Sequence, residues 1–395
     1  MALPVKQRKS RMRGIMGVVV GAMAFAICSV PPMANVLYAT YTNFWPPAMA
    51  AKVMGIAKGM ERFEVAKAAV ELGIFEILET GPKTAHSVAK GIGASERGTF
   101  VTLEYLKTMA LVKSDCGFFA SKPCEYSLAT STKMFLVKSA GPMNLGSFIA
   151  TVLGSEEKHS RLAKVKDAIV RGGVDPRNDN QDARNNNNEY YKEFAEATWT
   201  IAYEPAKRMA NFIQKFSSKK APSHILDVAC GSGAYGVLSA KKFPKVKITA
   251  LDQAVVIPST KKIVAENKVS DRFTFITGSA FDAPLPARKF DVIIIANFIH
   301  LFDPKTTADL LKRFKNSLAQ DGLVILSDII RHDKPSVTLL DDFSPIEFDF
   351  NMLATTVKGQ TYSIPELDKV FQAANLTRVA LKRNFPFPFT FVAAK

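Results

Sequence analysis

The sequence predicts an α/β protein: a Rossmann-like, mostly parallel sheet with an antiparallel last strand, preceded by an all-helical domain of winged-helix type. Three observations carry this prediction. The second half of the chain alternates short buried strands with helices, which is the pattern of a doubly wound sheet. The first of these strands leads into a glycine-rich turn and then a helix. The first half carries two short capped helices followed by a hairpin pattern.

With 395 residues the chain is too long for one ordinary core. We expect four segments: a basic tail with a hydrophobic anchor or targeting segment (1–45), a helical winged-helix domain (46–172), a polar Asn-rich linker (173–190) and the sheet domain (191–395). The formal net charge is +16, and no Asp or Glu precedes Glu61. We therefore assign much of the excess charge to the N-terminal tail and not to the folded body.

The first 45 residues have the pattern of a membrane or targeting segment. Residues 1–13 are basic, and Gly14–Val30 is an uncharged apolar run, near the lower limit of about 17 residues for a spanning helix. A basic stretch before an apolar core also describes a signal peptide. We expect membrane association or organelle targeting, with the membrane as a partner through residues 14–38 if they are retained. The basic tail would then be cytoplasmic. Whether the segment is anchor or cleaved signal stays open, as does the compartment.

The winged-helix prediction depends on caps and breakers. The pattern is helical from about Pro46 to Leu78. Thr84 and Ser95 are N-caps of two further helices, and glycines 91 and 93 separate them. A hairpin follows, from Leu111–Lys113 to Tyr126–Leu128, with Gly117 at its turn. Acidic residues nearly match basic ones over 61–140, so we expect a packing or dimerisation module and no nucleic-acid partner.

The four cysteines match no zinc or redox motif, and we infer no metal. Cys116 and Cys124 flank the expected hairpin turn and could pair in an oxidising compartment. Two unrelated, partly buried thiols are the favoured interpretation.

The glycine-rich turn carries the chemistry. The buried strand His224–Val228 precedes Ala229–Gly236, in which glycines 231 and 233 let the backbone approach a ligand closely. The next strand ends at Asp252, about 20 residues on, where a carboxylate can accept hydrogen bonds from both ribose hydroxyls. The acidic residue that ends the first strand, together with the short G-x-G, favours a methyl donor over a dinucleotide, because such a donor has no pyrophosphate and does not need the third glycine of the dinucleotide pattern. Asp227 would then organise the loop around the amino-acid end of that donor.

Further strands follow in the order that such a sheet requires. They are Phe273–Ile276, Phe290–Ile295 and Gly322–Asp328, with 377–382 and 389–393 as an antiparallel pair. Ligands bind at the carboxyl ends of parallel strands. Gly231, Asp252, Ser279, His300 and Asp328 all lie at such ends.

These motifs resemble those of the S-adenosylmethionine-dependent small-molecule O-methyltransferases, the group that contains acetylserotonin, caffeate and bacterial polyketide O-methyltransferases. The similarity runs from about residue 55 to the end, through AKAAVELGIFEIL, LDVACGSG, ALDQ, GSAF and ANFIHLFDP. It implies S-adenosylmethionine as cofactor and a homodimer formed through the N-terminal domain. It also implies a donor site made of Asp227, Ala229, Gly231, Gly233, Asp252, Gln253, Ser279, Ala280, Phe281 and Asn297.

The resemblance further implies that His300 is the general base and that Asp328 orients it. Imidazole has a reference pKa of about 6.5 and a phenol about 10, so a histidine can take the proton as the oxygen attacks the methyl group. Asn351 and Met352 are expected in the substrate wall, with Trp199, Phe343 and Phe348 as further candidates.

Two positions depart from the family pattern. Ser279 stands where the adenine segment usually carries an acid. Matching Thr361 to the family's threonine puts Gly359 in place of a second acid beside the histidine.

The sequence thus predicts a methyltransferase acting on a hydroxyl of a small aromatic or polyketide-like molecule. The alternatives are an N- or C-methyltransferase of the same fold, and a membrane-tethered donor-binding protein without methyl transfer. A nucleic-acid methyltransferase is disfavoured because Ala296–Ile299 replaces the Pro-Pro-aromatic motif of enzymes that methylate base amino groups.

Overall fold

The computed structural model describes residues 55–56, 58–116, 123–176, 190–216, 221–331, 345–384 and 389–395. Residues 64–333 and 344–395 belong to one compact unit, which contains the candidate site. Within the described ranges, no helix is both long and apolar enough to cross a bilayer. The predicted membrane segment, residues 14–38, lies outside those ranges.

The N-terminal domain has the predicted winged-helix order. Its elements are α4 (Gly59–Glu71), α5 (Ile74–Glu79), β1 (Lys83–Thr84), α6 (Ala85–Ile92), α7 (Glu96–Thr108), β2 (Val112–Ser114) and β3 (Glu125–Leu128). Thr84 and Ser95 cap α6 and α7 as expected, accepting from the backbone N–H groups of Ser87 and Gly98. The helix predicted up to Leu78 is broken at Gly73, whose φ of 71° is left-handed and separates α4 from α5.

The wing is a three-stranded antiparallel sheet in the order β1-β3-β2. The expectation of two unrelated thiols was wrong, because Cys116 and Cys124 form a disulfide with their Cα atoms 5.4 Å apart. Strands β2 and β3 pair antiparallel. Cys116, just after β2, and Cys124, just before β3, therefore lie within bonding distance of each other. The expected turn at Gly117 lies outside the described residues.

Short helices connect this domain to the sheet domain. They are α8 (Thr130–Phe135), η1 (Lys138–Met143), η2 (Phe148–Leu153), α9 (Glu156–Ala163) and α10 (Val165–Arg171). The long helix α11 (Tyr190–Phe216) then begins where helix was predicted to resume. Most of the predicted linker, residues 177–189, is not described.

The sheet domain confirms the predicted α/β fold. Its strands are β4 (His224–Val228), β5 (Lys247–Asp252), β6 (Phe273–Thr277), β7 (Phe290–Ala296), β8 (Leu318–Arg331), β10 (Arg378–Arg383) and β11 (Phe389–Ala394). They lie in the order β10-β11-β8-β7-β4-β5-β6, and β9 (Tyr362–Ser363) pairs with the end of β8. Strands β4 to β8 are parallel, whereas the last strand, β11, runs antiparallel between β8 and β10.

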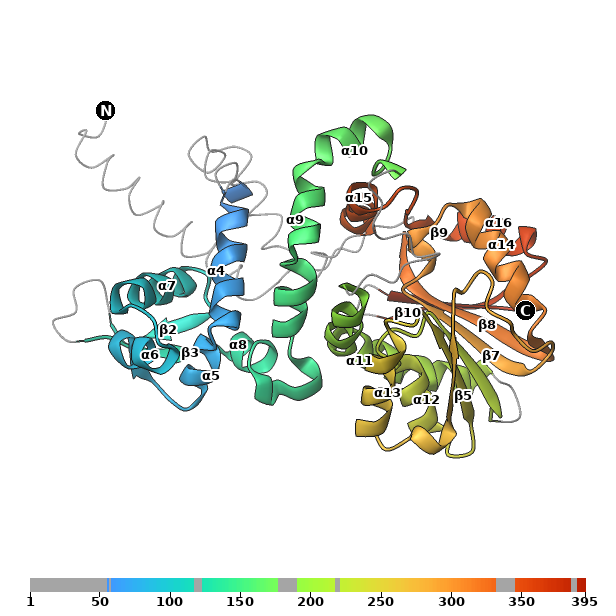
Figure 1. The fold of residues 1–395 in the computed structure, drawn as a ribbon, viewed down its shortest axis with the longest axis horizontal. Helices are drawn as coiled ribbons and strands as arrows, with labels where there is room; N and C mark the ends of the chain where they lie inside the picture. Colours follow the sequence, from blue (N-terminus) through green and yellow to red (C-terminus); the bar gives the residue numbers. More distant parts are fainter. Residues whose placement is uncertain are drawn as a thin grey trace, which may run out of the picture. The chain divides into compact units, whose positions relative to one another are not determined.

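Helices cover both faces of this sheet (Figure 1). α11, α12 (Ala234–Lys242) and α13 (Ile257–Glu266) pack on one face, and α14 (Pro304–Lys315) and α16 (Ile364–Ala373) on the other. Successive strand residues point to opposite faces, so Ile225 and Ile294 join one core whereas Leu226 and Ile293 join the other. Burial on both faces explains why the strands read as continuous apolar runs.

Much of the excess charge is expected in the N-terminal tail and not in the folded body, but the folded body carries a large share of it. Over the described residues 190–395, Lys and Arg exceed Asp and Glu by eight, which is half of the net charge of the chain. The tail, residues 1–45, carries five basic residues and no acid, so the sheet domain holds the larger share of the excess.

Candidate active site

The loop after β4 has the backbone that the glycine pattern predicted. Ala229, Gly231 and Gly233 all have positive φ, at 49°, 52° and 71°. A Cβ at Gly233 would lie 2.8 Å from the Thr260 methyl carbon, whereas one at Gly231 would meet no atom within 4 Å. Thr260 holds the loop by donating its hydroxyl to the Gly231 carbonyl at 2.7 Å. The loop is thus packed against α13 at Gly233 and open at Gly231.

Two carboxylates support this loop from neighbouring strand ends. The Oδ2 atom of Asp252 accepts from Gly231 N at 2.7 Å, and its Oδ1 accepts from Gln253 N at the same distance. Asp227 is buried and accepts from Gly236 N at 2.8 Å. Burial raises the pKa of Asp252 to about 6 and that of Asp227 to about 7. Asp227 therefore ties β4 to α12, while the partly exposed Asp252 keeps acceptor capacity for a ligand.

The ends of β6 and β7 add the remaining residues of the predicted donor site. Ser279 is buried, and its hydroxyl oxygen accepts from Phe281 N at 3.2 Å, so it shapes the loop that carries buried Ala280. The Phe281 ring packs edge-on against Phe302, 5.2 Å between centroids. Asn297 has a positive φ of 51°, and its buried Oδ1 has no hydrogen-bond partner among the described residues.

These features fit S-adenosylmethionine. The backbone at Gly231 is open, and the Asp252 carboxylate can accept from sugar hydroxyls. An orphaned buried oxygen such as Asn297 Oδ1 costs free energy unless a ligand donor reaches it, and the donor's ammonium group is such a group.

His300 and Asp328 form a buried pair at the carboxyl edge of the same sheet. The parallel register pairs Ala296 of β7 with Ser327 of β8, which brings the segments that follow them to the same edge. His300 Nδ1 lies 2.8 Å from Asp328 Oδ1, which also accepts from Ile329 N at 2.8 Å. Because that oxygen acts as an acceptor, Nδ1 carries a proton, and in the neutral imidazole Nε2 is then the nitrogen with the lone pair. This is the arrangement of an oriented general base.

Helix α15 (Pro345–Thr355) supplies the wall of the histidine. The Phe348 ring lies edge-on to the imidazole, 4.9 Å between centroids. The predicted wall residues Asn351 and Met352 follow it by three and four positions, so they share its face of the helix. Trp199 packs instead on Tyr203 in the core on the α11 side, at 5.8 Å, and Phe343 lies outside the described residues.

No side chain fits at Gly359, where the family's second acid was expected. A Cβ there would be 2.6 Å from the His300 carbonyl oxygen, which already accepts from Gln360 N at 2.8 Å. The segment that follows is held by an acid that the sequence did not single out. Asp349, on α15, accepts from Thr361 N at 2.6 Å.

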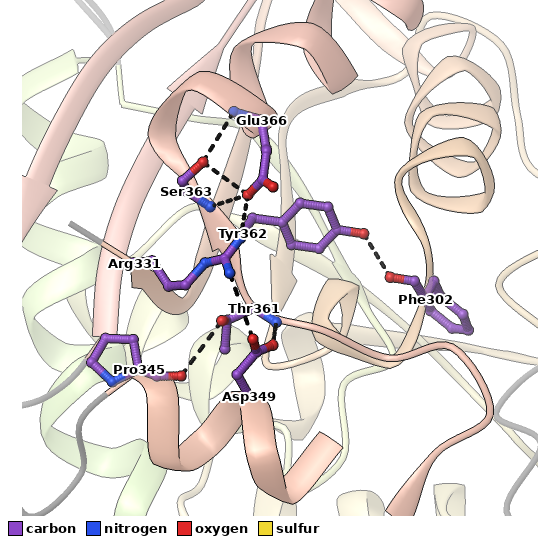
Figure 2. A network of polar contacts seen from close by, with 8 residues as sticks. All are labelled: Phe302, Arg331, Pro345, Asp349, Thr361, Tyr362, Ser363 and Glu366. Carbon is purple, nitrogen blue, oxygen red and sulfur yellow. Dashed lines mark hydrogen bonds and ion pairs between the residues drawn. The ribbon is translucent and has the colours of Figure 1, made fainter. Parts of the chain in front are cut away.

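Figure 2 shows how this acid belongs to a larger network. Arg331, the last residue of β8, lies 3.6 Å from the Asp349 carboxylate and 2.6 Å from that of Glu366. Glu366 in turn forms a capping box with Ser363 at the start of α16. The network joins the strand that carries Asp328 to the helix that carries Phe348. Arg331, Asp349 and Glu366 are far apart in sequence, so no local pattern predicts that they meet.

Comparison with known proteins supports this picture. The O-methyltransferase dimerisation domain model matches residues 54–138, and the O-methyltransferase domain model matches residues 180–376. The mouse acetylserotonin O-methyltransferase is 22% identical over 293 residues, covering 70% of this chain and 72% of the mouse protein. The 3-hydroxy-5-methyl-1-naphthoate 3-O-methyltransferase of Streptomyces sahachiroi is 21% identical over 334 residues, covering 83% and 90%.

Solved structures show the same fold. A Nostoc punctiforme protein assigned as an O-methyltransferase matches with a TM-score of 0.76 and 25% identity, over 87% of this chain and 98% of that one. Human N-acetylserotonin methyltransferase in complex with S-adenosylmethionine matches with a TM-score of 0.72 and 20% identity, over 88% and 97%.

Fold, glycine turn and acidic strand end, together with these relatives, define a class I methyltransferase that uses S-adenosylmethionine as its cofactor. The chain belongs to the O-methyltransferase family, whose catalytic and dimerisation models it matches in sequence. It is an S-adenosylmethionine-dependent O-methyltransferase of small molecules.

Proposed function

We propose that this enzyme methylates a phenol-type hydroxyl on a small aromatic or polyketide-like molecule, with His300 as the general base. The observation that carries the proposal is the buried His300–Asp328 pair, whose hydrogen bond leaves Nε2 as the proton acceptor. The edge-on contact of Phe348 with the imidazole favours a flat, apolar acceptor.

In this proposal the donor is held by the strand ends. The Asp252 carboxylate accepts from the ribose hydroxyls, and Asn297 Oδ1 accepts from the ammonium group. Gly231 and Gly233 bring the backbone close, with Asp227, Ala229 and Gln253 shaping the loop. Ser279, Ala280 and Phe281 line the adenine end. Bound S-adenosylmethionine supplies an electrophilic methyl group.

The chain's own contribution is to remove the acceptor's proton and to orient its oxygen. His300 Nε2 takes the hydroxyl proton as the oxygen–methyl bond forms and the sulfur–methyl bond breaks. The products are a methyl ether, the demethylated thioether and a protonated imidazole. Asp328 stabilises that cation through Nδ1, and Asn351 and Met352, on the face of α15 next to Phe348, position the acceptor ring.

Relatives support the substrate class. Proteins named for acetylserotonin and for a hydroxynaphthoate match over most of this chain. The match of residues 54–138 to the dimerisation model supports a homodimer formed through this domain.

A radiolabelled methyl-transfer screen against phenols, hydroxyindoles and polyketides tests the proposal. We expect transfer to at least one class, reduced by two or more orders of magnitude in His300→Ala. Donor binding measured by calorimetry should stay unchanged in that variant. His86→Ala, an exposed histidine on α6, is the matched control.

Each alternative gives a different result. If His300→Ala retains full transfer, the acceptor needs no base, and an N- or C-methyltransferase is indicated. If the donor binds without transfer to any acceptor, the protein is a donor-binding scaffold.

A further inference from the structure

A band of basic residues lies where the five parallel strands begin. In a doubly wound sheet the helices return antiparallel to the strands, so helix C-termini and strand starts share one edge. The residues that precede or open β4 to β8 are rich in Lys and Arg. We call this set the basic edge: Lys215, Lys241, Lys242, Lys245, Lys247, Lys268, Arg272, Arg288, Lys289, Lys312, Arg313 and Lys315.

The basic edge holds all the excess positive charge of the sheet domain. The acids in the same turns and helix ends are Glu266, Asp271, Asp291 and Asp321, which leaves eight net positive charges. Elsewhere in the described residues 190–395, acidic and basic residues are equal in number. The charge is therefore concentrated at the edge opposite the strand ends that carry Asp252 and Asp328.

Few of these charges are neutralised locally. Over the described ranges, the ion pair of Arg272 with Asp271, at 3.8 Å, is the one formed by a member of the basic edge. Arg313 and Lys315 donate to the backbone carbonyls of Ala283 and Asn375. Among the described residues, the exposed members without an ion pair are Lys215, Lys241, Lys242, Lys245, Lys247, Lys268, Arg288, Lys289 and Lys312.

Helix dipoles account for only part of the set. Cations near helix C-termini are stabilising, which explains Lys241, Lys242 and Lys312 in the last turns of α12 and α14. Lys245, Lys247 and Lys289 stand in turns or open a strand, where no dipole favours them. Helix dipoles therefore leave these three lysines unexplained.

We propose that the basic edge rests on an anionic lipid surface. Five strands at about 4.8 Å spacing spread the charge across roughly 20 Å, as broad contact with headgroups requires. The nearby aromatic rings of Phe243 and Phe290 are buried, so contact is electrostatic and shallow. Proteins that bind single-stranded nucleic acids stack the bases on exposed aromatic side chains. Among the described residues, no exposed large hydrophobic residue lies in these turns.

The sequence ahead of the folded body fits the same partner. It combines five basic residues within residues 1–13 with the apolar run Gly14–Val30. With the basic edge against the bilayer, the strand ends that carry His300 point away from it, and the acceptor enters from the water side.

Hydrogen exchange of the full chain mixed with vesicles tests this proposal. Vesicles of phosphatidylcholine alone should leave exchange in residues 241–247 and 285–290 as it is in solution. With about 30% phosphatidylserine, exchange there should slow severalfold, and 0.5 M NaCl should reverse the effect. Residues 297–303, at the opposite edge, should not respond.

Two matched variants sharpen the test. One variant carries four Lys→Gln changes in the basic edge, at Lys242, Lys245, Lys247 and Lys289. It should abolish the slowing of exchange by phosphatidylserine, since each lysine removed weakens binding to the vesicle about fivefold. The control variant removes as many exposed charges elsewhere, by changing Lys261, Lys305, Lys369 and Lys382 to Gln. It should keep the slowing of exchange by phosphatidylserine. The proposal is overturned if phosphatidylserine has no effect, if both variants behave alike, or if transfer RNA protects the same turns more strongly than the vesicles.

Discussion

Replacing Asp328 with Asn tests how the base is held. The side chain is 2% exposed, and its Oδ1 accepts from both His300 Nδ1 and Ile329 N. An amide oxygen can accept both bonds, so the geometry survives. What is lost is the negative charge that stabilises the imidazolium formed during methyl transfer.

The size of the effect follows from Coulomb's law. Two unit charges about 4 Å apart interact by about 4 kcal/mol at an effective dielectric constant of about 20. That is roughly a thousandfold in rate as an upper bound. Because the hydrogen bond remains, we expect kcat to fall between about a hundredfold and a thousandfold. Asp328 Oδ2 is buried without a partner among the described residues, so the neutral amide should not lower Tm.

The assay is steady-state methyl transfer to an acceptor found in the screen, with donor affinity from calorimetry and Tm from thermal unfolding. The reasoning is refuted if kcat is unchanged while Tm is retained. A fall in donor affinity that matches the fall in kcat would assign Asp328 to the donor site instead.

Three further predictions follow from the site. Gly233→Ala should raise the donor Kd about tenfold. The new methyl group would clash with Thr260, and a left-handed backbone costs a residue with a side chain about 1–2 kcal/mol. Gly93→Ala is the control, because Gly93 is also left-handed but has no neighbour there; it should lower Tm and leave the donor Kd unchanged. Donor Kd should rise about tenfold from pH 7 to pH 5, because Asp252, whose pKa is about 6, is protonated as the pH falls and no longer accepts from both hydroxyls; a flat Kd from pH 5 to 8 would contradict this. Asp349→Asn should raise the acceptor KM about two- to fivefold through the lost ion pair with Arg331, with donor Kd unchanged. Glu347→Gln on the same helix is its control, and equal effects of the two changes would count against the network.

The sheet domain could be predicted because its signals are local. Each strand is a short apolar run, and Gly231, Gly233 and Asp252 sit at fixed offsets along the chain. The N-caps Thr84 and Ser95 could be predicted for the same reason, from the residue type and the helix that follows each of them.

Features made by distant residues could not be predicted from the sequence alone. Arg331 meets Asp349 and Glu366 only because β8, α15 and α16 converge. Cys116 and Cys124 are separated by only eight positions, and the hairpin pattern allowed them to pair, but which interpretation holds depends on the register of β2 and β3. The basic edge is spread over five separate turns, each with only a few charges, so no single stretch of sequence predicts it as residues 1–13 predict a basic tail.

The most direct test of the central claim is single-turnover methyl transfer by donor-saturated enzyme as a function of pH, for the wild type and for His300→Ala. We expect the wild-type rate to level off well below the pKa of the acceptor hydroxyl, because the imidazole removes the proton within the transfer step. The rate of the variant should instead rise tenfold per pH unit up to that pKa, since only acceptor already ionised can react. Identical profiles for the two proteins would contradict the account.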